Sequence, residues 1–152
     1  MKKLKRLVKK LEKFISKEWV LITGILLVGF VVRLYKIDNP IADWHSWRQS
    51  DTAAVTRIYV EDGIKLFWPR YYDISSIQTG IYNPQGLRFV EFPIYNVAHA
   101  FLIQTFNTFS LVVWGRLLSV ALSLISTYLV FLIGKRFMGK WGGVLAAGFF
   151  AI

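Results

Sequence analysis

The segment ADWHSWRQSDTAA, residues 42–54, gathers the side chains with which this chain could do chemistry. If the segment is helical, Arg48 and Asp51 share one face. Asp43 then shares a neighbouring face with Trp47. A carboxylate can act as a general base on an acceptor hydroxyl, and an arginine can hold two phosphate oxygens at once. Transfer of a sugar from a lipid phosphate requires both groups.

The same residues also have purely structural interpretations. Asp43 is well suited to cap a helix, since aspartate is among the preferred residues at that position. Asp51 and Arg48 are suited to a surface ion pair that contributes little stability. Trp47 is suited to an aromatic belt at a membrane surface. Spacing alone therefore leaves the catalytic and the structural interpretations open.

Besides the acidic residues of this segment, three further residues are weighed as functional candidates: Glu91, His99 and His45. Glu91 stands just before a proline-initiated helix, where it can serve a site or simply complement the helix dipole. His99 lies in an apolar stretch, where a histidine is a functional candidate but more often forms a hydrogen bond between helices. His45 has no partner at metal-binding spacing, and the chain has no cysteine. The pattern assigns no cofactor and leaves a divalent metal open.

Composition indicates a membrane protein. The chain is 55% hydrophobic and 16% aromatic, with a mean hydropathy of +0.43. Its net charge of +10 is concentrated in residues 1–18, which hold eight of the nineteen lysines and arginines. Residues 35–92 are close to neutral, with six basic and seven acidic side chains. The charge is therefore an N-terminal feature, and we expect no nucleic-acid partner.

The N-terminal region is predicted to anchor the chain in a membrane. Residues 1–18 alternate lysines with apolar residues at three- and four-residue intervals, which predicts a basic amphipathic helix on an anionic membrane face. Residues 19–35 are predicted to form a transmembrane helix, with Arg33 reaching toward the headgroups. No small-residue cleavage pattern follows, which favours an uncleaved anchor over a signal peptide.

Residues 36–92 are predicted to form an outer loop, because they are too polar for lipid. The lysine-rich N-terminus is expected on the cytoplasmic side of a plasma (inner) membrane, and this loop is then expected outside. Residues 44–62 contain neither glycine nor proline and predict a helix within the loop.

Further spans are predicted at 93–108 and 111–134, and 141–152 is predicted to begin another that is cut short. The fold class is thus an all-α, multi-pass helical bundle, and the chain is expected to be part of a longer protein. Counting crossings from a cytoplasmic N-terminus places the basic cluster at 135–140 outside, although basic residues usually lie on the cytoplasmic side of a membrane. The alternative is that 93–108 only dips into the membrane. The spanning hairpin is preferred.

Three stretches carry a resemblance to a known family: ADWHSWRQSDTAAVTRIY, VEFPIYNVAHAFL and WGRLLSVALSLISTYLVFLIGKRFMG. Together they resemble the N-terminal module of membrane glycosyltransferases of the GT-C superfamily. The likeness is greatest to family 39 proteins related to dolichyl-phosphate-mannose protein mannosyltransferases and to the bacterial aminoarabinose transferase. The HSWRQ-x-DTA element is similar to that of a prokaryotic subgroup.

The resemblance implies an inverting transferase that takes a sugar from a polyprenyl-phosphate carrier at the outer membrane face. An early acidic residue of the first outer loop would be the base. Many relatives carry an Asp-Glu pair there, whereas Asp43 is followed by Trp44, so Asp43 and Asp51 both stay candidates, with Asp43 slightly preferred. The substrate-binding residues that the resemblance implies are Trp47, Arg48, Gln49 and Glu91.

The partners implied are membrane lipid and a lipid-linked sugar donor, whereas the acceptor is undetermined. The fragment alone is expected to be inactive, because the family's later spans also bind the donor. A second hypothesis is a noncatalytic membrane anchor or assembly subunit that binds a partner through the tryptophans of its outer loop. A transporter fragment using His99 and Arg116 is a weaker hypothesis, because the sequence offers each of these residues singly and without a charged partner in its span.

Overall fold

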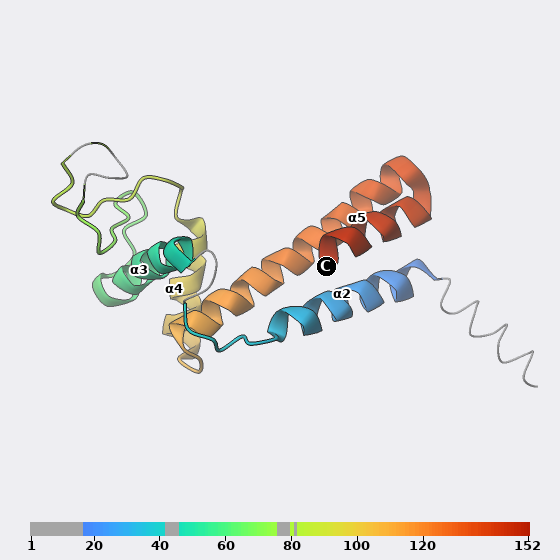
Figure 1. The fold of residues 1–152 in the computed structure, drawn as a ribbon, viewed down its shortest axis with the longest axis horizontal. Helices are drawn as coiled ribbons and strands as arrows, with labels where there is room; N and C mark the ends of the chain where they lie inside the picture. The colour runs from blue at the N-terminus through green and yellow to red at the C-terminus, as the bar shows by residue number, and fades with distance from the viewer. Residues whose placement is uncertain (1–16, 42–45, 76–79, 81) are drawn as a thin grey trace, which may run out of the picture. The chain divides into compact units, whose positions relative to one another are not determined.

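The structure is a computed structural model that describes residues 17–41, 46–75, 80 and 82–152. Within these residues the chain forms helices joined by irregular segments, with no β-strand (Figure 1). The predicted all-α fold class is confirmed for this part of the chain. The chain divides into two compact units. The first unit joins the residues up to Tyr35 with Ser119–Ile152, and the second unit is Lys36–Leu118.

Helix α2, Glu18–Leu34, covers nearly the same residues as the helix predicted for 19–35. Its sequence is apolar apart from the ends, where Glu18 stands in the first turn and Arg33 in the last. Both charges complement the helix dipole. Seventeen residues at 1.5 Å each give a length of about 25 Å. The amphipathic helix predicted for residues 1–18 lies outside the described residues, apart from its last two positions.

Helix α5, Leu111–Ala151, contains both of the last two predicted helices. Its backbone leaves the helical conformation at Gly139 (φ 71°, ψ −174°), and Figure 1 shows the residues after this kink folded back beside those before it. The two arms approach closely at Gly143, where a Cβ atom would lie 2.6 Å from the carbonyl oxygen of Phe131. The first arm continues past the predicted end at 134, because lysine and arginine are good helix formers.

Among the described residues, α5 is the one helix that is long and apolar enough to cross a membrane by length and composition. Only 22% of its most apolar stretch is buried inside the protein. The core helix of a soluble protein, in contrast, buries most of its apolar surface.

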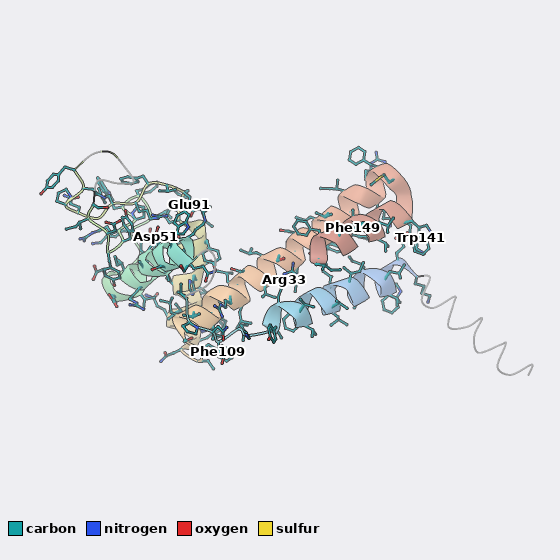
Figure 2. The ribbon with its side chains drawn as sticks, viewed as in Figure 1. Arg33, Asp51, Glu91, Phe109, Trp141 and Phe149 are labelled. Carbon is teal, nitrogen blue, oxygen red and sulfur yellow. The ribbon has the colours of Figure 1, made fainter. Side chains whose placement is uncertain are left out.

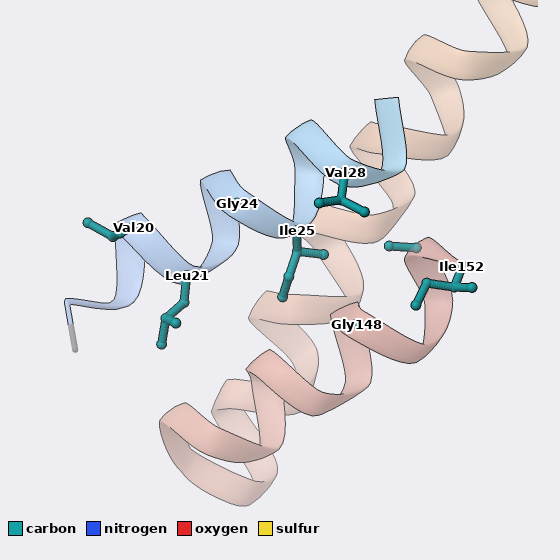
Figure 3. Close-up of a pocket in the computed structure, with 8 residues that line it drawn as sticks. Val20, Leu21, Gly24, Ile25, Val28, Gly148 and Ile152 are labelled. Atoms are coloured by element: carbon teal, nitrogen blue, oxygen red, sulfur yellow. The ribbon is translucent and has the colours of Figure 1, made fainter. Parts of the chain in front are cut away.

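The first unit packs α2 against both arms of α5 around Ile22, Phe131 and Ala147. Near one end Lys135 pairs with Glu18. Near the other end, Nη1 of Arg33 donates to the carbonyl oxygen of Ala151 at 2.5 Å. Helix α2 and the first arm of α5 therefore run in opposite directions. An apolar groove of about 350 Å³ opens on this unit (Figure 3), and its lining is Val20, Leu21, Gly24, Ile25, Val28, Gly148, Ala151 and Ile152.

The second unit is built on two helices, α3 (Ser46–Asp62) and α4 (Ile94–Phe106). They pack around Val55 and Tyr59 of α3, Ala100 of α4 and Tyr71 of the intervening chain. Helix α3 falls within the predicted range of 44–62, and residues 44 and 45 lie outside the described part of the chain. Helix α4 begins directly after Pro93 and extends about 20 Å, less than the roughly 30 Å of a hydrocarbon core.

The turn between α4 and α5 is fixed by two side chains of α4 that bond to backbone carbonyl oxygens of α5. Nε2 of His99 lies 2.8 Å from the carbonyl oxygen of Leu111, and the hydroxyl of Tyr95 donates to the carbonyl oxygen of Gly115 at 2.7 Å. His99 thus makes the helix-to-helix hydrogen bond that is its commoner role. Nη1 of Arg116 donates to the carbonyl oxygen of Lys36 at 2.7 Å.

Candidate functional site

Two ion pairs join α3 to the segment that precedes α4. Nη2 of Arg48 lies 3.0 Å from Oε2 of Glu91 and 3.2 Å from Oε1, so one nitrogen contacts both carboxylate oxygens. Nη1 of Arg88 lies 2.9 Å from Oδ2 of Asp51. Each segment contributes a cation followed three residues later by an anion, and the cation of each segment pairs with the anion of the other. A slip of one segment along the other would bring like charges together, so the two pairs fix one register.

The two pairs differ in burial. The side chains of Arg48 and Glu91 are about half exposed, at 52% and 51%. The side chain of Arg88 is only 7% exposed and that of Asp51 19%. An exposed pair contributes little and opens easily, whereas a buried charge that loses its partner is costly. Arg48 is therefore available to a ligand, and the Asp51–Arg88 pair holds the fold.

A tight turn positions Arg88. The amide of Asn83 donates to the carbonyl oxygen of Leu87 at 2.9 Å, and its oxygen accepts from the amide nitrogen of Leu87 at 2.9 Å. Gly86 has a φ of 61°, and a Cβ atom there would lie 2.5 Å from the carbonyl oxygen of Tyr71. This close approach requires glycine. The turn thereby directs Arg88 toward α3.

The ring of Tyr71 packs against the guanidinium of Arg88. The guanidinium carbon of Arg88 lies 5.1 Å from the centre of the Tyr71 ring, within the range of a cation–π interaction. Burial raises the pKa of Tyr71, and the negative charge of Asp73 acts in the same direction. The phenol therefore stays neutral at physiological pH and presents its ring to the cation.

A set of hydrogen bonds joins α4 to the first turns of α3. Nδ2 of Asn96 donates to the carbonyl oxygen of Thr52 at 2.8 Å and to Oγ1 of Thr56 at 3.1 Å. Oγ1 of Thr52 donates in turn to the carbonyl oxygen of Arg48 at 2.9 Å. Asn96 is buried, so its loss would leave polar groups without partners. These hydrogen bonds therefore fix the backbone that carries Arg48.

A cavity of about 10 Å³ lies among these groups. That volume admits one water molecule. It is far smaller than the 300–1,000 Å³ of a typical ligand pocket. The cavity is therefore too small for a substrate group, whereas the half-exposed side of Arg48 is open to a ligand. The cavity is lined by Thr52, Val55, Pro69, Arg88, Glu91, Pro93 and Asn96.

The structure brings three of the predicted site residues to one place: Asp51, Arg48 and Glu91. Figure 2 shows Asp51 and Glu91 at the same end of the second unit. Trp47 is 59% exposed, and Gln49 is partly buried on the same helix. Asp43, predicted as the preferred base, lies outside the described residues.

Two residues of the site were not predicted. Arg88 and Asn96 are each buried and bonded to α3, yet neither belongs to the HSWRQ-x-DTA element. Arg88 carried one usable signal: it stands between two apolar residues and three positions before Glu91, which mirrors the spacing of Arg48 and Asp51. Asn96 carried a weaker one, as an amide in an apolar helix, where such groups form interhelical hydrogen bonds.

No group of three or more His, Asp or Glu side chains that could hold a metal ion occurs in the part of the chain that the structure describes. His99 is buried, and its Nδ1 has no hydrogen-bond partner among the described atoms.

Comparison of the chain with protein-family models, with curated proteins and with solved structures finds no match. The chemistry of the site is that of a half-exposed guanidinium beside a carboxylate, on a helix fixed by a buried ion pair. Such a guanidinium can bind an anionic group in bidentate fashion.

Proposed function

We propose that this chain is the N-terminal part of an integral membrane glycosyltransferase. It would transfer a sugar from a polyprenyl-phosphate-linked donor to an acceptor at the outer membrane face, with a carboxylate as general base. The observation that carries the proposal is the half-exposed Arg48, held at a fixed place by Thr52 and by its pair with Glu91. The donor phosphate would replace the Glu91 carboxylate as its partner.

In this proposal the base is Asp43, and Asp51 is a positioning residue. The carboxylate of Asp51 is largely buried and paired with Arg88, and this arrangement suits a residue that fixes α3. A base must reach the acceptor hydroxyl, directly or through one water. Asp43 precedes α3 and its fixed ion pairs by only a few residues, which supports its assignment to this role.

The proposed membrane topology has two crossings, α2 and the first arm of α5, followed by the second arm. The Glu18–Lys135 pair supports it, because it brings the start of α2 and the basic cluster of α5 to one end of the first unit. That end would be cytoplasmic, together with the N-terminal lysines. The chain between the two crossings, residues 36–110, would then lie outside, with α4 making no crossing. This removes the conflict over the basic cluster by taking the alternative in which 93–108 only dips into the membrane.

Binding of the lipid carrier tests the role of Arg48 in the chain itself. The chain, reconstituted in nanodiscs, is titrated with polyprenyl phosphate, and binding is followed by native mass spectrometry. Arg48→Gln should weaken binding about tenfold or more, because a charged hydrogen-bonded contact contributes about 1.5–3 kcal/mol. Arg57→Gln is the matched control, since it lies on α3 nine residues away and so on the opposite face. Equal binding by both variants and the unmodified chain would exclude Arg48 as the phosphate site.

The alternative function, a noncatalytic anchor or assembly subunit, is favoured by one observation. Large aromatic side chains are exposed on the second unit, among them Trp47 and Trp68, both at 59%. An anchor would retain its partner when Arg48 is changed and would show no affinity for polyprenyl phosphate. The titration above therefore separates the two functions.

A further inference from the structure

Four exposed aromatic side chains form two ring pairs on the second unit, and we call these four residues the aromatic patch: Phe67, Trp68, Phe89 and Phe92. Their exposed fractions run from 57% to 72%. The ring centres of Phe67 and Phe92 lie 6.2 Å apart, and those of Trp68 and Phe89 lie 6.4 Å apart. Two loops thus place their aromatic residues side by side and leave them open, although such residues normally dominate a core or an interface.

The patch continues onto the outward face of α4. Ile94 is 66% exposed and Phe101 is 60% exposed, and their spacing of seven residues places them on one face of the helix. The opposite face carries the buried Asn96 and His99. Helix α4 therefore buries the polar side chains of Asn96 and His99 and exposes the apolar side chains of Ile94 and Phe101, which is unusual for a helix whose outer face meets only water.

We propose that the aromatic patch and the Ile94–Phe101 face of α4 rest in the headgroup layer of the bilayer, so that α4 lies along the membrane surface. Two observations select lipid as the occupant. The same chain contains α5, which is long and apolar enough to cross a bilayer, and the second unit is covalently continuous with this helix. Lys65 and Arg70 flank Phe67 and Trp68, with no acidic residue between Gly63 and Tyr72.

This combination is one that interfacial segments use. Aromatic rings settle at the level of the headgroups, while neighbouring cations bind lipid phosphates. The surface is distinct from the Arg48 site, and the inference holds whether or not the chain transfers a sugar.

Site-directed spin labelling tests the inference, because the chain has no cysteine and each new cysteine is unique. Single cysteines replace Phe67, Phe89, Phe92 or Phe101, all exposed, so the core is left intact. Asp62→Cys and Gln85→Cys provide exposed polar controls, and Leu129→Cys on α5 provides a reference for lipid. The labelled chains are placed in vesicles of phosphatidylcholine and phosphatidylglycerol, and helix content is checked by circular dichroism.

Collision rates are measured with oxygen, which concentrates in lipid, and with a nickel chelate, which stays in water. The ratio of oxygen to nickel collisions at the patch and at Phe101 should lie closer to that of Leu129 than to that of the two controls. Ratios equal to those of the controls would place the patch in water and overturn the inference. Labels that neither reagent reaches would show a protein partner or a second copy on the patch, and this too would overturn it.

A second measurement uses an unlabelled chain. Brominated lipids quench only tryptophans near the bilayer, so Trp68→Phe should lower the quenched fraction of the fluorescence. An unchanged fraction would contradict immersion of the patch. Neither experiment uses a sugar donor, so failure here leaves the proposed transferase untouched, and loss of donor binding leaves this inference untouched.

Discussion

Arg88 and Asp51 form an ion pair that is almost closed to solvent, with Nη1 and Oδ2 2.9 Å apart and the guanidinium stacked over Tyr71. The pair joins a turn of irregular chain to the first half of α3. It stands beside the more exposed Arg48–Glu91 pair, which has the same chemistry and a different role.

Removal of the buried pair should destabilise the second unit. Asp51→Asn leaves the buried guanidinium of Arg88 without its anion, and we expect a loss of about 3 kcal/mol in the free energy of unfolding. Arg48→Gln, which breaks the exposed pair, should cost less than about 1 kcal/mol. Denaturant unfolding of the chain in mild detergent, followed by tryptophan fluorescence, measures both. Equal losses would show that burial does not distinguish the two pairs.

Glu91→Gln should strengthen binding of polyprenyl phosphate. Glu91 occupies the guanidinium of Arg48, and its neutralisation removes a competitor whose exposed contact contributes about 0.2–1 kcal/mol. The dissociation constant should fall by up to about fivefold. Glu61→Gln is the control, since Glu61 is exposed at the far end of α3 and bonds to Tyr72. Weaker binding by Glu91→Gln alone would instead make Glu91 a direct ligand of the donor.

The helical hairpin of α5 should depend on Gly143. A Cβ atom there would lie 2.6 Å from the carbonyl oxygen of Phe131 and 2.9 Å from the amide nitrogen of Lys135, so Gly143→Ala forces the arms apart. We expect a destabilisation of about 1–3 kcal/mol. At Gly148 the space is open, and Gly148→Ala should be tolerated. Unfolding of both variants in detergent gives the comparison, and equal stability would contradict the close packing of the two arms.

The proposed topology predicts opposite sides for two exposed positions. A cysteine at Met138 should react with an impermeant maleimide only after the cytoplasmic side of the membrane is opened, and a cysteine at Asp62 should react in intact cells. Both positions lie outside the buried contacts, so labelling reports location and not folding. Reaction of both cysteines in intact cells would show that α5 does not return the chain to the cytoplasm, as in the spanning hairpin.

Local sequence signals predicted the helices well and the site only in part. Uncharged apolar runs located α2 and α4, and the lack of glycine and proline located α3, to within about two residues, because these signals act along the chain. A break between 134 and 141 was predicted and contains the kink at Gly139, but the packing of the second arm of α5 on the first was not predicted, since it depends on contacts between the two arms.

Dependence on contacts between distant segments also explains why two residues of the site were not predicted. Arg48 and Asp51 were found because their spacing on one helix is visible in the sequence. Arg88 and Asn96 join them through the turn at Asn83 and the packing of α4 on α3, which bring together residues that are far apart in the sequence. The pairing of Asp51 with Arg88 also changes its proposed role, from a candidate base to a positioning residue.

The central proposal is transfer of a sugar from a polyprenyl-phosphate donor with Asp43 as the base. Membranes that contain the protein in its natural context are supplied with the radiolabelled donor, and transfer to endogenous acceptor is followed over time. Asp43→Asn should lower the rate by about a hundredfold or more, since general-base catalysis contributes about 10²–10⁴-fold, while carrier binding by the chain stays unchanged. Transfer at the normal rate by Asp43→Asn, or no transfer by the unmodified protein from any polyprenyl-phosphate sugar, would contradict the account.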